Sequence, residues 1–131
     1  MAHPNVDLLR KGYDAFGNGD LDTIRNEVFS RDMVLHVAGR SPLSGDYQGV
    51  DRVFEFFGKL FELSGGTFAL ELHDAVANDH HAIGLSSVSA QRDGKTLDGA
   101  KGVEIYHVQD GRVTEAWFTT EDDYSFDEFW S

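Results

Sequence analysis

The first half of the chain carries apolar residues at the spacing of amphipathic helices. Pro4 suits the first turn of a helix, where its missing N–H needs no partner, and an apolar stripe follows it as far as Phe16. Asn18 and Gly19 are typical of a helix end, and Asp20 is typical of the N-cap of the next helix. The pattern predicts three helices, over residues 4–17, 20–31 and 50–63.

The second half alternates between apolar and polar residues, as half-buried strands do. Asp93-Gly94 and Asp110-Gly111 are typical of two-residue hairpin turns. The glycine, serine and proline residues of segment 39–49 predict a loop. Strands are predicted over residues 33–38, 67–77, 82–92, 96–109 and 112–120.

This order, α-α-β-α-β-β-β-β, predicts a single α+β domain over residues 1–131. A curved antiparallel sheet that three helices close on one side makes a cone. The interior of such a cone is the natural place for a ligand, although a solid core fits the same pattern.

Composition narrows the function classes. The 131 residues include 23 acidic and 11 basic ones, a formal net charge of −12, which argues against nucleic acid and anionic membrane as partners. The chain has no cysteine, so disulfides and thiolate metal sites are excluded. With no secretory signal and no apolar run of membrane-spanning length, we expect a cytoplasmic protein.

The tail, residues 121–131, has five acidic residues, no basic one and four aromatic residues. Aromatic side chains at this density favour burial over a disordered acidic tail. We therefore expect the tail to pack on the domain or to cover the mouth of a pocket.

Three stretches of the sequence are similar to a known family. They are residues 19–22, with the sequence Gly-Asp-Leu-Asp, residues 34–45, and residues 110–117, with the sequence Asp-Gly-Arg-Val-Thr-Glu-Ala-Trp. These stretches resemble the SnoaL-like polyketide cyclases. These cyclases belong to the nuclear-transport-factor-2-like superfamily, together with ketosteroid isomerase and limonene epoxide hydrolase. The resemblance covers nearly the whole chain. It implies a cone-shaped fold, a homodimer through the exposed face of the sheet, and any of several activities or none.

The resemblance also places site residues. His36 falls where ketosteroid isomerase has its general base, and Glu104 falls at or near the second carboxyl of that enzyme's oxyanion hole. The tyrosine on the first helix of that enzyme matches Gly12, with Tyr13 about 100° further round the helix. Phe118 stands where SnoaL-type cyclases often have an aspartate, and the Asp-Arg-Asp set of the epoxide hydrolases has no match.

His36, Glu104 and Tyr106 are the candidate catalytic residues. An imidazole titrates near neutrality, so His36 could remove a proton next to a carbonyl group, while Glu104 orients it or donates to an enolate. Tyr106 shares the strand face of Glu104. Two alternatives stay open: His36 as a core or dimer-interface residue, and a register shifted by one that places His107 inside instead of Glu104.

Further side chains are expected to line the pocket: Tyr13, Phe16, Val34, Arg40, Phe57, Phe61, Ala116 and Phe118. The remaining histidines, His73, His80 and His81, match no closed metal motif, so neither a metal nor a cofactor is expected.

Two functions follow from these residues. The first is binding of a small, largely apolar carbonyl compound, polyketide-like or steroid-like, with cofactor-free proton abstraction by His36. The second is a non-catalytic ligand-binding or dimerisation module that kept the cone. A third, weaker interpretation is a hydrolase in which His36 activates water.

Overall fold

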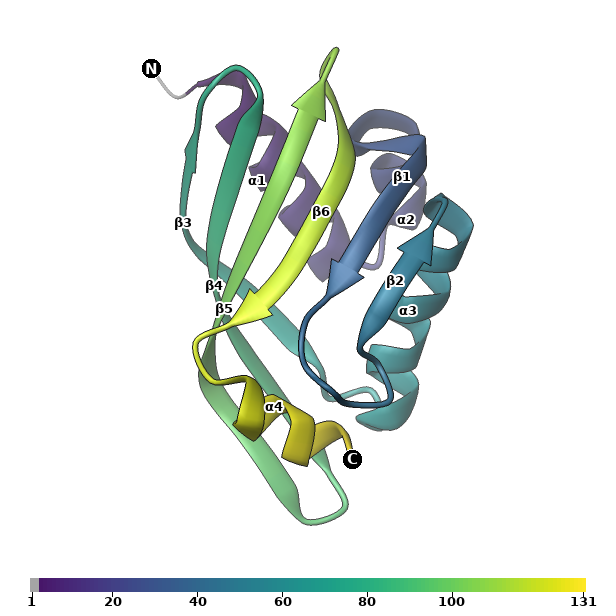
Figure 1. Cartoon of the computed structure of the whole chain (residues 1–131), viewed down its shortest axis with the longest axis vertical. Helices are drawn as coiled ribbons and strands as arrows, with labels where there is room; N and C mark the ends of the chain where they lie inside the picture. The colour runs from purple at the N-terminus through teal and green to yellow at the C-terminus, as the bar shows by residue number, and fades with distance from the viewer. Residues whose placement is uncertain (1–2) are drawn as a thin grey trace.

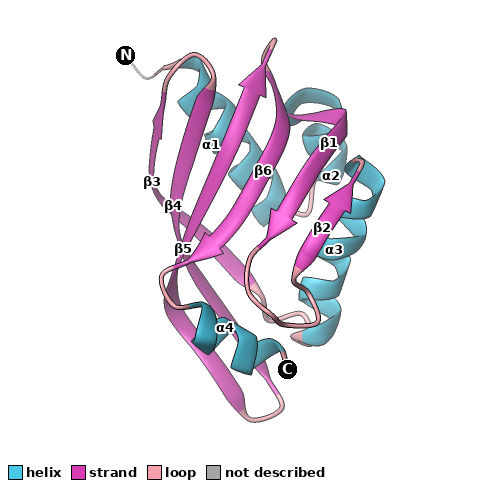
Figure 2. Ribbon diagram, in the orientation of Figure 1, coloured by secondary structure: helices cyan, strands magenta, loops and turns pink. Residues whose placement is uncertain are grey.

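The computed structural model describes residues 3–131 as one curved sheet with helices on its concave side (Figures 1 and 2). The helical elements are α1 (Pro4–Gly17), α2 (Leu21–Thr23), the π-helical turn η1 (Ile24–Val28), α3 (Val50–Leu63) and α4 (Asp123–Trp130). The strands are β1 (Phe29–Val37), β2 (Gly45–Gln48), β3 (Ala69–Ala77), β4 (His81–Arg92), β5 (Lys95–Gln109) and β6 (Arg112–Thr120). None of these helices is long and apolar enough to cross a membrane.

The sheet has the strand order β2-β1-β6-β5-β4-β3. The predicted α+β fold and order of elements are confirmed, with two local differences. The predicted loop contains β2, which pairs antiparallel with the end of β1 and so provides hydrogen-bond partners for the backbone of that strand. The sheet is mixed rather than fully antiparallel, since β1 and β6, which are far apart in the sequence, pair as parallel neighbours.

The predicted second helix is shorter than expected. Asp20 caps α2 as predicted, its carboxylate accepting from the Thr23 backbone N–H at 3.1 Å. The chain then makes the π-helical turn and enters β1 at Phe29, four residues before the predicted start. The turn directs Ile24 and Val28 into the core, where each is 2 % exposed.

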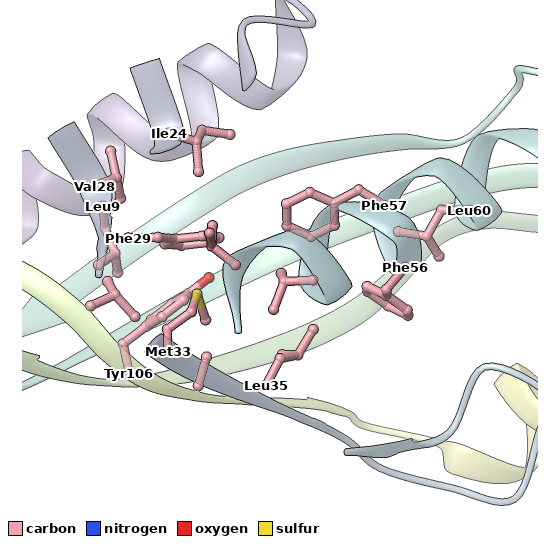
Figure 3. Packing of buried hydrophobic residues seen from close by; sticks show 14 of the residues in the cluster. Leu9, Ile24, Val28, Phe29, Met33, Leu35, Phe56, Phe57, Leu60 and Tyr106 are labelled. Atoms are coloured by element: carbon pink, nitrogen blue, oxygen red, sulfur yellow. The ribbon is translucent and has the colours of Figure 1, made fainter. Parts of the chain in front are cut away.

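The core lies between the helices and the concave face of the sheet. Side chains of α1, η1, β1 and α3 converge there with Tyr106 of β5 (Figure 3). Residues at alternate positions of β1, namely Met33, Leu35 and Val37, point to this inner face, and Met33 and Leu35 are fully buried. The opposite, outer face of the sheet keeps Val76 and Leu85 exposed.

The C-terminal tail forms α4, which lies across one end of the sheet near the loop between β1 and β2 (Figure 1). Phe129 and Trp130 are buried in the core cluster. Lys95 of the β4–β5 hairpin donates to the Glu128 carbonyl at 2.7 Å, which ties down the end of the helix. Through its buried aromatic side chains the tail closes part of the space under the sheet.

Candidate functional site

A largely apolar cavity of about 130 Å³ lies between the inner face of the sheet and helices α1, α3 and α4. Aromatic side chains make up much of its wall: Tyr13, Phe16, Phe29, Phe56, Phe57, Phe68, Tyr106, Phe118, Phe126 and Trp130. The volume is close to the roughly 150 Å³ of an apolar protein cavity that binds benzene. A single ring, or one ring of a larger compound, therefore suits this space.

Three hydroxyls and one carboxyl form a polar cluster in this apolar cavity. Tyr13 of α1 donates to Oε1 of Glu104 at 2.5 Å, and its hydroxyl lies 2.8 Å from that of Tyr106. Ser86 of β4 donates to the other carboxyl oxygen, Oε2, at 2.9 Å. Glu104 and Tyr106 share the inner face of β5, and the neighbouring strand β4 pairs with β5 in antiparallel orientation. The predicted register is therefore adopted, and His107 lies on the outer face.

The hydroxyl protons of this cluster are all engaged. Tyr13 has one proton and gives it to Glu104, so Tyr106 must be the donor in the bond between the two tyrosines. Ser86 gives its proton to the same carboxyl. This arrangement suits an ionised Glu104, which only accepts, and each carboxylate oxygen keeps a lone pair for a proton from a ligand.

Burial sets the acid–base character of the cluster. It raises the pKa of Glu104 from 4.5 to about 7, against the opposing effect of the hydrogen bonds from Tyr13 and Ser86. Burial, with the neighbouring Glu104 charge, also raises the pKa of Tyr13 and Tyr106, so both tyrosines stay protonated. A carboxyl that titrates near neutrality is suited to general acid–base catalysis.

Two glycines leave room for these polar groups. A Cβ atom at Gly102 would lie 2.7 Å from both Oε2 of Glu104 and Oγ of Ser86. A Cβ atom at Gly84 would lie 2.5 Å from the Tyr13 hydroxyl oxygen. Any side chain at either position would displace the carboxyl or the phenol.

The structure places His36 on the outer face of the sheet, away from this cavity. Its Nδ1 lies 2.7 Å from Asp46 and its Nε2 lies 2.6 Å from Glu115, while its ring stacks on Trp117 at 5.4 Å between centroids. These hydrogen bonds, chiefly the one to Asp46 and then the one to Glu115, raise the pKa of His36. Of the three candidate catalytic residues, the structure brings together Glu104 and Tyr106 and leaves His36 apart.

The predicted lining residues divide in the same way. Those that line the cavity are Tyr13, Phe16, Phe57 and Phe118. Ala116 is fully buried opposite Tyr106, and Phe61 packs its ring against Phe16 and Phe68 at the end of α3. Val34 shares the outer face with His36, and Arg40 is exposed. None of these four is in the cavity wall.

Several site residues were not predicted from the sequence. Ser86 donates to the carboxyl, Gly102 leaves room for it, and Gly84 leaves room for the Tyr13 hydroxyl. Asp123 and Asp127 of α4 lie in the cavity wall. A glycine inside a strand indicates a close approach by another group, and that signal was present at Gly84 and Gly102. Over residues 3–131, the structure has no group of three or more histidine or acidic side chains placed to hold a metal ion.

Comparison with known proteins places this geometry in a family. The model of the SnoaL-like domain matches residues 9–116. Bal32a, from a soil-derived mobile gene cassette, is 34% identical with a TM-score of 0.93, over 99% of this chain and 98% of its own. A protein of unknown function with a cystatin-like fold from Xanthomonas campestris is 29% identical with a TM-score of 0.89, over 100% of this chain and 99% of its own.

A more distant structure shares the fold alone. IdmH of Streptomyces antibioticus, a proposed polyketide cyclase, is 19% identical with a TM-score of 0.70, over 91% of this chain and 92% of its own. No curated protein matches the sequence. The family model covers most of the chain, and the similar structures share its nuclear-transport-factor-2-like fold. The chain therefore belongs to the SnoaL-like domain family.

Proposed function

We propose that this protein binds a small, largely apolar carbonyl compound in the cone and catalyses cofactor-free proton transfer at the carbon next to the carbonyl group. One observation carries the proposal: Glu104 is the acid of a hydrogen-bonded cluster inside an apolar cavity, and its pKa is raised to about 7. A base with a pKa near the working pH combines a useful ionised fraction with useful basicity.

The reaction begins with Glu104 ionised. The carboxylate takes a proton from the α-carbon of the ligand, the C–H electron pair moves into the enolate, and Glu104 becomes neutral. The acid can then donate to Tyr13, which turns its own proton toward Tyr106. This reversal frees the Tyr106 proton for the enolate oxygen, where a preorganised donor stabilises the developing charge. Return of the proton to another carbon completes an isomerisation. In a ring closure the enolate carbon instead attacks a second carbonyl group of the ligand, and the proton from Glu104 goes to the alkoxide oxygen that this attack forms.

The family comparison supports the class of ligand. A proposed polyketide cyclase has the same fold, and polyketides are carbonyl-rich compounds with acidic α-hydrogens. The aromatic wall of the cavity suits a ring system, and its few polar groups suit one oxygen function. Glu104 takes the role of base that the sequence suggested for His36, because only Glu104 lies in the cavity wall.

The test is hydrogen exchange at the α-carbons of 2-tetralone, a two-ring ketone, followed by NMR in deuterated buffer. The wild type should accelerate exchange, and Glu104→Gln should lower that acceleration by about 10²-fold or more, the usual range for a general base. 2-Naphthol, which resembles the enol of this ketone, should still bind to the variant. The matched control is His36→Gln, which should exchange as fast as the wild type.

Each outcome decides between the candidate functions. Full activity of Glu104→Gln contradicts the proposed base. Loss of activity in His36→Gln would return that role to His36. Binding of 2-naphthol by the wild type with no exchange of 2-tetralone would favour the alternative, a non-catalytic ligand-binding module.

We also propose that two copies pair through the outer face of the sheet, as the resemblance implies. In support, Leu85 is 39% exposed and Val76 is 54% exposed on this face, and Trp117 lies on the same face, in one row of paired residues with Val76, Ile83 and Ile105. Light scattering should give a dimer for the wild type and a monomer for Leu85→Glu. A monomeric wild type would contradict the pairing.

A further inference from the structure

The charged groups of the cavity are all of one sign. Glu104 lies inside, and Asp123 and Asp127 of α4 lie in the wall, but none of the lining residues is a lysine, arginine or histidine. An anionic ligand would meet three carboxyl groups and no cation there. This arrangement selects by charge as well as by shape.

The two aspartates occupy one face of α4, four residues apart, where like charges repel. Each has one oxygen already engaged: Thr120 donates to Oδ1 of Asp123 at 2.6 Å, and the Arg40 backbone N–H donates to Oδ1 of Asp127 at 2.8 Å. For Oδ2 of each aspartate, residues 3–131 provide no hydrogen-bond partner. A positively charged group seated here would donate to both free oxygens and relieve the repulsion.

The basic side chains nearest to α4 do not supply that charge. Within the part of the chain that the structure describes, the Arg40 guanidinium makes no ion pair and is not in the cavity wall. Lys95 and Arg92 donate instead to carbonyl groups of the last residues, Glu128 and Ser131. The aspartate pair is therefore open to a cation from outside the chain.

The aromatic residues of α4 complete the arrangement. Phe126 and Trp130 line the same cavity as the two aspartates. Aromatic faces attract alkylammonium groups, and carboxylates beside them add a direct ion pair. Acidic and aromatic side chains together are the chemistry that binds an amine.

We infer that the ligand of this cavity is an apolar ring compound with a protonated amino group, and that this group lies at the α4 end, between Asp123 and Asp127. The inference rests on the proposed function, since it concerns the ligand of the same cavity. The ring body would extend from α4 toward Glu104, whose two oxygens already accept from Tyr13 and Ser86.

Three naphthalenes that differ only in charge test this. They are 2-(aminomethyl)naphthalene, 2-(hydroxymethyl)naphthalene and 2-naphthoic acid, with affinities measured by calorimetry at neutral pH. The amine should bind roughly tenfold more tightly than the alcohol, as two partly exposed ion pairs allow, and the carboxylate more weakly than the alcohol. In about 1 M NaCl, where the Debye length is about 3 Å, the preference should shrink.

Two double variants separate the local pair from the net charge. Asp123→Asn with Asp127→Asn should remove the preference for the amine and keep the affinity for the alcohol. Glu121→Gln with Glu128→Gln removes the same charge from exposed positions outside the cavity wall and should keep the preference.

The outcomes also separate this inference from the proposed function. Equal binding of the three compounds overturns the inference and leaves a neutral apolar ligand for the cavity. A preference that survives the aspartate variant but not Glu104→Gln overturns the placement of the amine. If none of the three compounds binds, both the inference and the proposed cavity ligand are wrong.

Discussion

The two faces of the sheet each hold a glutamate that is hydrogen-bonded to an aromatic residue, and they give it different chemistry. On the inner face, Glu104 accepts from Tyr13, and burial raises the pKa of the acid to about 7. On the outer face, Glu115 lies 2.6 Å from His36 with its side chain 35% exposed, and there the pKa of the imidazole is raised. Water access, more than the number of hydrogen bonds, separates a candidate base from a surface ion pair.

The largest expected effect of the difference between the two faces is on the pH dependence of stability. Below pH 4.5 Glu104 is protonated in both folded and unfolded chains, and from there to about pH 7 only the folded chain keeps the proton. The free energy of unfolding should therefore fall as pH rises through this window, by about 3 kcal/mol in total from this group.

Urea unfolding of the wild type and Glu104→Gln across this range measures the contribution. The variant should gain stability relative to the wild type as pH rises, and the difference should level off above about pH 7. Parallel pH curves for the two proteins would mean that Glu104 titrates as an ordinary surface acid.

Gly102→Ala tests the space around the inner carboxyl. The added Cβ would lie 2.7 Å from Glu104 and Ser86, so the variant should lose about 1–3 kcal/mol of stability and most of its 2-tetralone exchange. Gly58→Ala is the matched control, because its Cβ in α3 would meet nothing within 4 Å. The control should be more stable, by up to about 1 kcal/mol. Equal behaviour of the two variants would show that the carboxyl does not need Gly102.

Tyr13→Phe removes one hydrogen-bond donor from the cluster on the inner face. The variant should lose about 1–2 kcal/mol of stability, since Tyr106 loses its partner and Glu104 loses a hydrogen bond. That bond lowers the pKa of Glu104, so the midpoint of the pH–exchange profile should move upward. Tyr124→Phe, at a tyrosine that is 89% exposed, should change neither property. An unchanged midpoint in Tyr13→Phe would show that Tyr13 does not influence the titration of Glu104.

His36→Gln gives the smallest expected effect, on the outer face. Because the folded pKa of His36 is raised above 6.5, its stabilising effect is complete below pH 6.5 and is lost as pH rises through the folded pKa. The loss should stay under about 1 kcal/mol and shrink in high salt, as for other exposed ion pairs. A larger, salt-independent effect on thermal unfolding would indicate a buried role for His36.

The sequence was most informative where polar and apolar residues alternate along β5, which placed Glu104 and Tyr106 correctly on one face. The Asp110-Gly111 turn pairs Gln109 with Arg112, and a bulge next to His107 then shifts the register, so that Glu104 lies opposite Phe118. Helix α3 has the predicted bounds, because its apolar stripe begins and ends next to glycine or serine.

The face of His36 was harder to predict. In β1, apolar residues occupy consecutive positions from Met33 to Leu35, so alternation does not show which face is buried. The chain also enters this strand earlier than predicted, and a shift by one residue moves every side chain to the other face. The contact of Ser86 with Glu104 and the place of Asp127 in the cavity wall depend on tertiary packing, which a single sequence does not display.

The most direct test of Glu104 as the base is a measurement of its own pKa. Carbon-13 NMR of the glutamate side-chain carboxyls, with the Glu104 signal assigned by its loss in Glu104→Gln, would follow the titration in the free protein. The midpoint should lie near 7, well above 4.5. A midpoint near 4.5 would leave the cavity with an ordinary carboxylate and would contradict the proposed base.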